Sequence, residues 1–192
     1  MHVAEQPAEV SACVEEYGRT PVALLETEGL LSERFTAVHA IHVTPKAIPS
    51  FARTGAMVCA CPTTERNLGD GVVPAHEYFK HGVQVCLGTD SLASISKVHG
   101  KAPKLNMFAE MKTLASLEPE LAPQAILEMA TTKPARALKH EGELGILDEG
   151  ARADVIVVPF SGRSETVHET LVHFEGPVRG SMIDGRWAIT PN

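Results

Sequence analysis

The chain has 192 residues, 44% of them hydrophobic, which suits one ordinary domain, or a domain and a small appendage, with a real core. A formal net charge of −7 argues against nucleic acid as a partner, and no apolar run approaches the ~20 residues that a membrane span needs. The first residues lack the pattern of a secretory signal, and four cysteines in apolar surroundings indicate reduced thiols. We therefore expect a cytoplasmic globular protein.

Residues 1–91 alternate between short apolar runs and stretches of helical periodicity. We predict strands at 1–4, 35–38, 56–61 and 83–87, and helices at 5–17, 21–28, 44–54 and 74–81. The segment 63–71 is rich in turn residues and is predicted to be a loop. Such alternation of strands and helices predicts parallel βα units.

The character of the sequence changes twice after residue 90. An irregular loop containing Lys97, His99 and Lys101 is followed by predicted helices at 105–116, 123–131 and 134–139. Residues 142–192 are instead rich in short β-like runs, at 155–158 and 178–189, with hairpin signals at Glu149-Gly150 and Asp184-Gly185. We therefore divide the chain into an α/β part, 1–141, and a small antiparallel β part, 142–192.

Ionisable side chains stand at three of the four predicted strand ends before residue 91. The first strand ends in His2 with Glu5, His39 follows the second strand, and Asp90 follows the fourth after Gly88 and Thr89. The carboxyl ends of parallel strands meet at one edge of a sheet, where α/β barrels place their chemistry. Imidazole and carboxylate groups are ligands for Zn²⁺ and are also the commonest general acids and bases. The joint pattern favours a metal-dependent hydrolase.

Structural roles remain open for each of these residues. Asp90 is a metal ligand, a general base or a cap for the loop that follows it. Glu5 is also explained as ordinary charge in the first turn of a helix, and His39 or its neighbour His42 as a structural histidine. The pair Cys59-Ala-Cys61 has metal-binding chemistry, although a Cys-x-Cys in a strand more often packs in a core.

Three motifs resemble the later strand-end motifs of the amidohydrolase superfamily: His2-x-Ala-Glu5, Val38-His39-Ala-Ile-His42 and Gly88-Thr-Asp90-Ser. The tail is also similar, in residues 129–138 and 145–158, to the superfamily's closing helices and its return to a β-sandwich. Within the superfamily, residues 1–91 most resemble formimidoylglutamate deiminase. Residues beyond Ser91 are more similar to nucleoside-type deaminases and chlorohydrolases.

The resemblance implies the C-terminal half of a (β/α)8 TIM barrel, followed by a small antiparallel β portion, in a deaminase or iminohydrolase. It implies one Zn²⁺, or Fe²⁺, bound by His2 and by Asp90, which also takes the proton of the attacking water. His39 would orient that water or stabilise developing charge, and Glu5 would protonate the leaving nitrogen. The segment 63–71 would shape the pocket. Glu65, Arg66 and Ser91 are the candidates for binding a small polar, formimidoylglutamate-like substrate.

One part of the family pattern is absent from this sequence. No His-x-His triplet occurs, and four strands are visible where a closed barrel of this kind has eight. We therefore expect an N-terminal half of the barrel as the partner, and a homo-oligomer when the enzyme is complete. The alternatives are a purine- or nucleoside-type aminohydrolase or chlorohydrolase, and a catalytically inactive fragment or assembly subunit.

Overall fold

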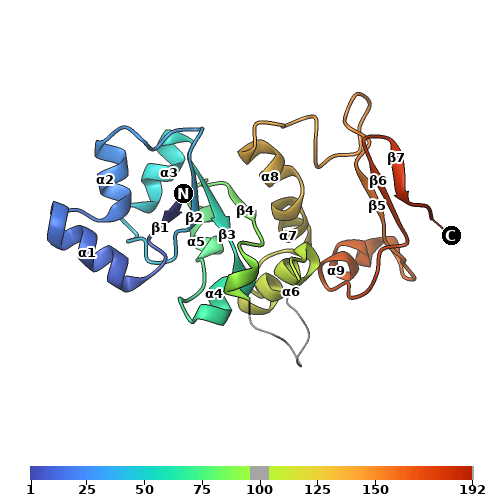
Figure 1. The fold of residues 1–192 in the computed structure, drawn as a ribbon, viewed down its shortest axis with the longest axis horizontal. Helices are drawn as coiled ribbons and strands as arrows, with labels where there is room; N and C mark the ends of the chain where they lie inside the picture. The colour runs from blue at the N-terminus through green and yellow to red at the C-terminus, as the bar shows by residue number, and fades with distance from the viewer. Residues whose placement is uncertain (96–103, 192) are drawn as a thin grey trace.

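The computed structural model describes residues 1–95 and 104–191, and its first half is a four-stranded parallel sheet (Figure 1). The strands β1 (His2–Val3), β2 (Thr36–His39), β3 (Met57–Ala60) and β4 (Val85–Leu87) lie side by side in chain order. All three neighbouring pairs are parallel, which confirms the predicted βα units. The carboxyl ends of the four strands therefore lie along one edge of the sheet.

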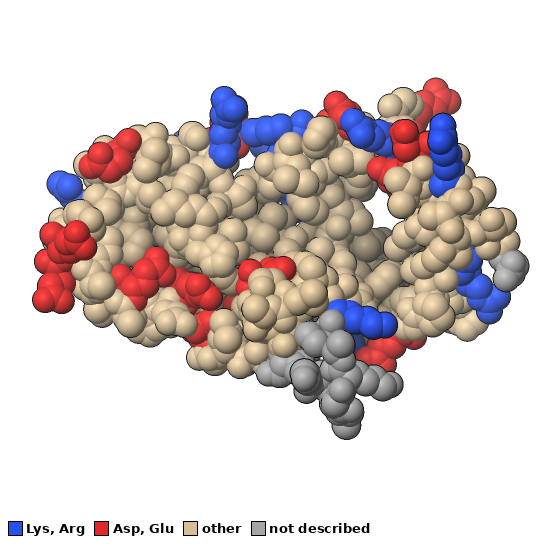
Figure 2. Space-filling model, in the orientation of Figure 1, with Lys and Arg blue, Asp and Glu red and all other residues tan. Residues whose placement is uncertain are grey.

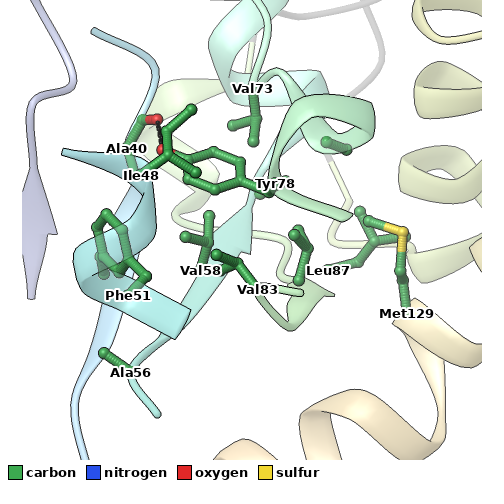
Figure 3. Packing of buried hydrophobic residues seen from close by; sticks show 14 of the residues in the cluster. Ala40, Ile48, Phe51, Ala56, Val58, Val73, Tyr78, Val83, Leu87 and Met129 are labelled. Atoms are coloured by element: carbon green, nitrogen blue, oxygen red, sulfur yellow. Dashed lines mark hydrogen bonds between the residues drawn. The ribbon is translucent and has the colours of Figure 1, made fainter. Parts of the chain in front are cut away.

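The core lies between one face of this sheet and the surrounding helices. Val58 and Leu87 point into it and meet Phe51, Tyr78 and Met129, as Figure 3 shows. Side chains alternate along a strand, so Cys59 and Cys86, which are register partners on β3 and β4, lie on the opposite face. Helices α1 (Pro7–Tyr17) and α2 (Pro21–Thr27) follow β1, α3 (Ile48–Thr54) follows β2, and α5 (Ala75–Lys80) precedes β4.

The segment predicted to be a loop, 63–71, is mostly helical, and this prediction was wrong. Pro62 occupies the first position of α4 (Pro62–Leu68), where its fixed φ favours a helix, and Gly69 ends the helix with a φ of 75°. A carboxylate from another helix also satisfies the first turn, because Glu110 accepts a hydrogen bond from the Thr63 N–H at 2.9 Å. The prediction relied on the turn-forming residue types within 63–71, which carry no information about a partner as distant in sequence as Glu110.

The helices after β4 occur near their predicted positions. They are α6 (Met107–Leu117), α7 (Pro123–Ala130) and α8 (Thr132–Ala137), and a 3₁₀ turn that was not predicted, η1 (Leu92–Ser94), precedes them. The predicted irregular loop with Lys97, His99 and Lys101 lies outside the described residues. In the described part of the chain no helix has the length and apolar character to cross a membrane.

The C-terminal part contains a three-stranded antiparallel sheet, β5 (Val155–Val157), β6 (Gly180–Ile183) and β7 (Arg186–Ile189). The run predicted at 178–189 is thus two strands joined by the expected hairpin at Asp184-Gly185. Glu149-Gly150 forms a turn that leads toward β5 rather than a hairpin. An unpredicted segment, η2 (Ser164–Thr166) with α9 (Val167–Val172), packs on α6 and α7 through the buried Val172. The division at residue 141 stays a prediction.

Candidate active site

The ends of β1 and β2 bring His2, Glu5 and His39 together. His39 pairs in register with Val3, so its side chain leaves the sheet beside the end of β1. The Glu5 carboxylate lies between the two imidazoles, with its Oε2 3.5 Å from His2 Nδ1 and its Oε1 3.5 Å from His39 Nε2. The two rings meet edge to face at a centroid distance of 4.7 Å. One donor atom from each residue lies within 4.8 Å of the others, a spacing that suits a metal ion.

Asp90 follows β4 on the same edge but stands outside that group of three. Its Oδ2 accepts a hydrogen bond from Ser94 Oγ at 2.9 Å, so the carboxylate also secures η1. Its charge nevertheless reaches His39, since it is one of the negative groups that raise the pKa of that imidazole. Ser91 is exposed, and its Oγ caps η1 by accepting from the Ala93 N–H at 2.9 Å.

His39 is fully buried and has a different neighbour at each ring nitrogen. Its Nδ1 lies 3.3 Å from Glu65 Oε1, whereas its Nε2 is buried without a hydrogen-bond partner among the described residues. Burial lowers the pKa of His39, but the hydrogen bond to Glu65 and the charges of Glu5, Glu65 and Asp90 raise it. The pKa of His39 therefore lies above its ordinary value.

Four residues at these strand ends have a left-handed backbone: Ala4 (φ 51°), His39 (φ 69°), Ala40 (φ 51°) and Asp90 (φ 49°). Such a conformation costs a residue with a side chain about 1–3 kcal/mol and persists only where the surroundings hold it. The Tyr78 hydroxyl, from α5, donates to the Ala40 carbonyl at 2.7 Å, as Figure 3 shows. The strained edge is therefore held from the helical layer behind it.

A second set of side chains fixes the loops around this edge. Glu9, on α1, accepts from the backbone N–H groups of Ala4 at 2.7 Å and Glu5 at 2.8 Å. His42 Nε2 donates to the Asp70 carbonyl at 2.8 Å, which makes His42 a structural histidine. Gln6 Nε2 donates to Asp70 Oδ1 at 3.0 Å. The sequence did not reveal the roles of Gln6, Glu9, Asp70 or Tyr78. For Glu9 there was one local signal, its place as an acidic residue in the first turn of α1.

The substrate-binding candidates on α4 point in different directions. Glu65 is buried and faces His39, whereas Arg66 is exposed and lines a separate cavity of about 420 Å³ beside Lys112 and Phe174. No contact among the described residues joins Arg66 or Ser91 to His2, Glu5 and His39. Successive helical residues are about 100° apart around the helix axis, which explains the separation of Glu65 from Arg66.

The thiols of Cys59, Cys61 and Cys86 form a cluster on the face of the sheet opposite the helices. Cys59 is hydrogen-bonded to both of the others, and the four cysteines of the chain are free. These hydrogen bonds lower the pKa of Cys59, while the same bonds and burial raise the pKa values of Cys61 and Cys86. Cys61 and Cys86 are buried and Cys59 is half-buried, so the three thiols pack against one another within the fold.

The residues at the strand ends fit a divalent metal. His2 and Asp90 offer an imidazole and a carboxylate at this edge, the donor types that Zn²⁺ takes, and the buried His39 Nε2 beside them has no hydrogen-bond partner among the described residues. In Figure 2 acidic side chains also form a band over the part of the surface that holds the strand ends and α4. This edge of the sheet thus attracts a cation.

Comparisons place these features among known proteins. The amidohydrolase family model matches residues 1–188. The chain is 36% identical over 195 residues to the 5-methylthioadenosine/S-adenosylhomocysteine deaminase of Moorella thermoacetica, covering 96% of this chain and 43% of that protein. The enzyme of the same name from Pyrococcus furiosus is 32% identical over 82% of this chain and 37% of its own length.

Two solved structures have the same fold. An adenosine deaminase from Xanthomonas campestris with bound zinc gives a TM-score of 0.88 at 30% identity, over 98% of this chain and 44% of that one. An atrazine chlorohydrolase from Arthrobacter aurescens complexed with zinc gives 0.83 at 25% identity, over 98% and 43%. The chain therefore spans less than half the length of the proteins that it matches. These relatives favour the nucleoside-type alternative, and the comparisons do not support the formimidoylglutamate-like prediction.

Proposed function

This chain belongs to the amidohydrolase family, and we propose that it carries the proton-handling half of the active site of a metal-dependent deaminase for purine-nucleoside-like substrates. The reaction replaces an exocyclic C–NH₂ group by an oxygen from water and releases ammonia. The observation that carries this proposal is the cluster of His2, Glu5 and His39, in which the buried Nε2 of His39 has no hydrogen-bond partner among the described residues. The names of the deaminase relatives support the substrate class.

We assign the metal, most simply Zn²⁺ with Fe²⁺ as the alternative, to His2 and to Asp90. Ser94 occupies Asp90 Oδ2, so the proposed ligand atom is Oδ1. A bound divalent ion would supply the Lewis acidity that makes water a nucleophile near neutral pH. Asp90 would accept the proton of the attacking water, because a carboxylate is the base at that strand end.

Glu5 and His39 divide the remaining work. Glu5 is partly exposed and lies between the two imidazoles, where a carboxylic acid could donate its proton to the departing nitrogen. His39 presents its unpartnered Nε2 toward Glu5 and would stabilise the negative charge that develops on the substrate. The ligands that complete the metal site would come from polypeptide equivalent to the part of the relatives that this chain does not match. The complete enzyme would be a homo-oligomer in the reducing cytoplasm, to which the free cysteines are suited.

Substitution of Glu5 tests the proposal in the complete enzyme, with the N-terminal part supplied. Glu5→Gln keeps size and hydrogen bonding but removes the acid, so the metal content should stay while turnover falls by roughly 10²–10⁴. Metal analysis and ammonia release measure the two effects, with the exposed Glu15→Gln as the control. Loss of the metal in Glu5→Gln would overturn the assignment of Glu5.

Substrate choice provides a separate test. Ammonia release from adenosine, 5-methylthioadenosine or S-adenosylhomocysteine should exceed release from formimidoylglutamate by orders of magnitude. In the same assays His39→Asn should spare the metal, whereas Asp90→Asn should reduce both metal affinity and rate. Neither metal binding nor ammonia release from any of these substrates would favour the alternative of an inactive assembly subunit.

A further inference from the structure

The buried imidazole of His39 is held on the side that faces away from Glu5. Glu65, 1% exposed, places its Oε1 3.3 Å from His39 Nδ1. The same oxygen accepts a hydrogen bond from the Cys61 N–H at 2.7 Å. Both neighbours of Oε1 are nitrogen atoms, and one of them is a backbone donor, so Oε1 acts as an acceptor.

The position of Glu65 is fixed by the helix that carries it. Cys61 lies between the end of β3 and the start of α4, so its N–H orients the carboxylate from the edge of the sheet. On the far side of α4, the buried Glu110 of α6 accepts from the Thr63 N–H at 2.9 Å. The carboxylate therefore sits on a turn that is anchored to both the sheet and a neighbouring helix.

We propose that Glu65 is a positioning residue that keeps the proton of His39 on Nδ1 and turns its Nε2 toward the reaction site. This inference rests on the function proposed above for His39. A neutral imidazole has one N–H, and a hydrogen bond from Nδ1 leaves Nε2 with a free lone pair. In the protonated ring the same bond holds Nδ1–H while Nε2–H faces the site. In both states the ring presents a defined atom beside Glu5.

The same atoms admit one other interpretation. His39, Cys61 and Glu65 offer donor atoms within 4.8 Å of one another, which is close enough for a second metal ion. However, Glu65 Oε1 already accepts from a backbone N–H, and hydrogen bonding to Cys59 together with burial favours the neutral thiol of Cys61. These contacts favour the positioning role over a ligand role.

Nitrogen NMR of ¹⁵N-histidine-labelled chain tests the tautomer directly, without any assay of activity. His39, identified by its absence from the spectrum of His39→Asn, should carry its proton on Nδ1 in the wild type and in Glu65→Gln, whose amide oxygen is still an acceptor. Glu65→Met should shift the proton to Nε2. Glu110→Gln, an equally buried acid beside the same helix without contact to His39, should leave the His39 signals unchanged. A neutral His39 with its proton on Nε2 in the wild type would overturn the proposal, even if Glu65→Met does not fold.

Kinetics of the complete enzyme provide the second arm. Glu65→Met should lower kcat by roughly 10²-fold, the effect of a misplaced reacting group, with KM changed less than about threefold. Glu65→Gln should recover most of that loss, and Glu110→Gln should retain wild-type turnover. Equal rates in wild type and Glu65→Met would contradict a positioning role.

Full activity of His39→Asn would refute the proposed function while leaving the NMR result intact. A thiolate–Cd²⁺ absorption band that is lost in Cys61→Ala would establish the second metal site instead.

Discussion

At the scale of single residues, the candidate site is held by bonds that cross from one chain segment to another. Tyr78 lies 38 residues from the carbonyl it binds, and Glu65 lies 26 residues from His39. The sequence predicted that His2, Glu5, His39 and Asp90 stand at strand ends, because ionisable residues follow apolar runs there. It could not predict the partners of those residues, since these depend on how distant helices pack.

Replacing Tyr78 by Phe should destabilise the fold while keeping the ring in the core. The substitution leaves the Ala40 carbonyl without its donor beside a strained backbone, so the free energy of unfolding should fall by about 1–2 kcal/mol. Burial raises the pKa of Tyr78, so the hydroxyl stays a proton donor throughout the range of stable pH. Urea unfolding measures the change, and Tyr17→Phe, at an exposed site on α1, should alter it by less than about 0.5 kcal/mol. Equal losses in both variants would show that the Ala40 bond is unimportant.

At the scale of elements, the sheet was predictable and α4 was not. The alternation of apolar runs and helices depends on local sequence, and it located β1–β4 and most helices. In contrast, the first turn of α4 donates a hydrogen bond to a carboxylate of α6, which is distant in sequence. Gly88 likewise lies close to a thiol of the neighbouring strand β3. A Cβ at position 88 would lie 2.8 Å from Cys59 Sγ and 3.4 Å from Cys61 Sγ. Glycine is thus required two residues before Asp90.

A double-mutant cycle tests this close approach. Gly88→Ala should lower the free energy of unfolding by about 1–3 kcal/mol, because the added methyl group overpacks the sheet against sulfur. Cys59→Ala removes the nearest sulfur, so Gly88→Ala should cost less free energy of unfolding in the Cys59→Ala background than in the wild type. The double variant should therefore be more stable than the sum of the two single changes predicts. Additive effects of the two substitutions in urea unfolding would show that the sulfur contact does not limit position 88.

The acid that anchors α4 predicts a pH dependence. Burial raises the pKa of Glu110 above 4.5, so the folded state binds its proton more tightly than the unfolded state. Stability therefore falls as the pH rises from the unfolded pKa through the folded one. Glu110→Gln lacks this loss, so its stability relative to the wild type should be higher at about pH 7 than at about pH 4. Glu77→Gln should change in the opposite sense, because Lys80 lowers the pKa of the exposed Glu77. The same trend in both variants would contradict the assignment.

At the scale of the whole molecule, each sheet has a feature that favours association: the first has outer strands without a further strand among the described residues, and the second exposes apolar side chains. The parallel sheet has β1 and β4 as its outer strands. The antiparallel sheet exposes large apolar side chains: Ile156, Ile183, Trp187 and Ile189. The fold class followed from the strand–helix alternation and the family motifs. The segment α9 between β5 and β6 was not predicted; its six residues form a short helix that contacts α6 and α7, with Val172 buried.

The isolated chain should associate as its concentration rises, since open strand edges and exposed apolar surface favour pairing between copies. Sedimentation should show a rising average mass. Ile156→Lys combined with Ile183→Lys should move the transition to higher concentration, whereas Val14→Lys on α1 should move it less. A monomer at all concentrations, with a reversible and cooperative melt, would contradict this expectation.

The order of the strands has a consequence for the way the sheet assembles. In the parallel sheet, neighbouring strands are also consecutive in the sequence. No later segment therefore has to insert between two strands that have already paired. During synthesis the sheet can grow from one side by adding one strand and its helix at a time, which keeps the chain closures short. In that order of growth, Glu65 would reach His39 when α4 forms, and Asp90 would join the edge when β4 docks.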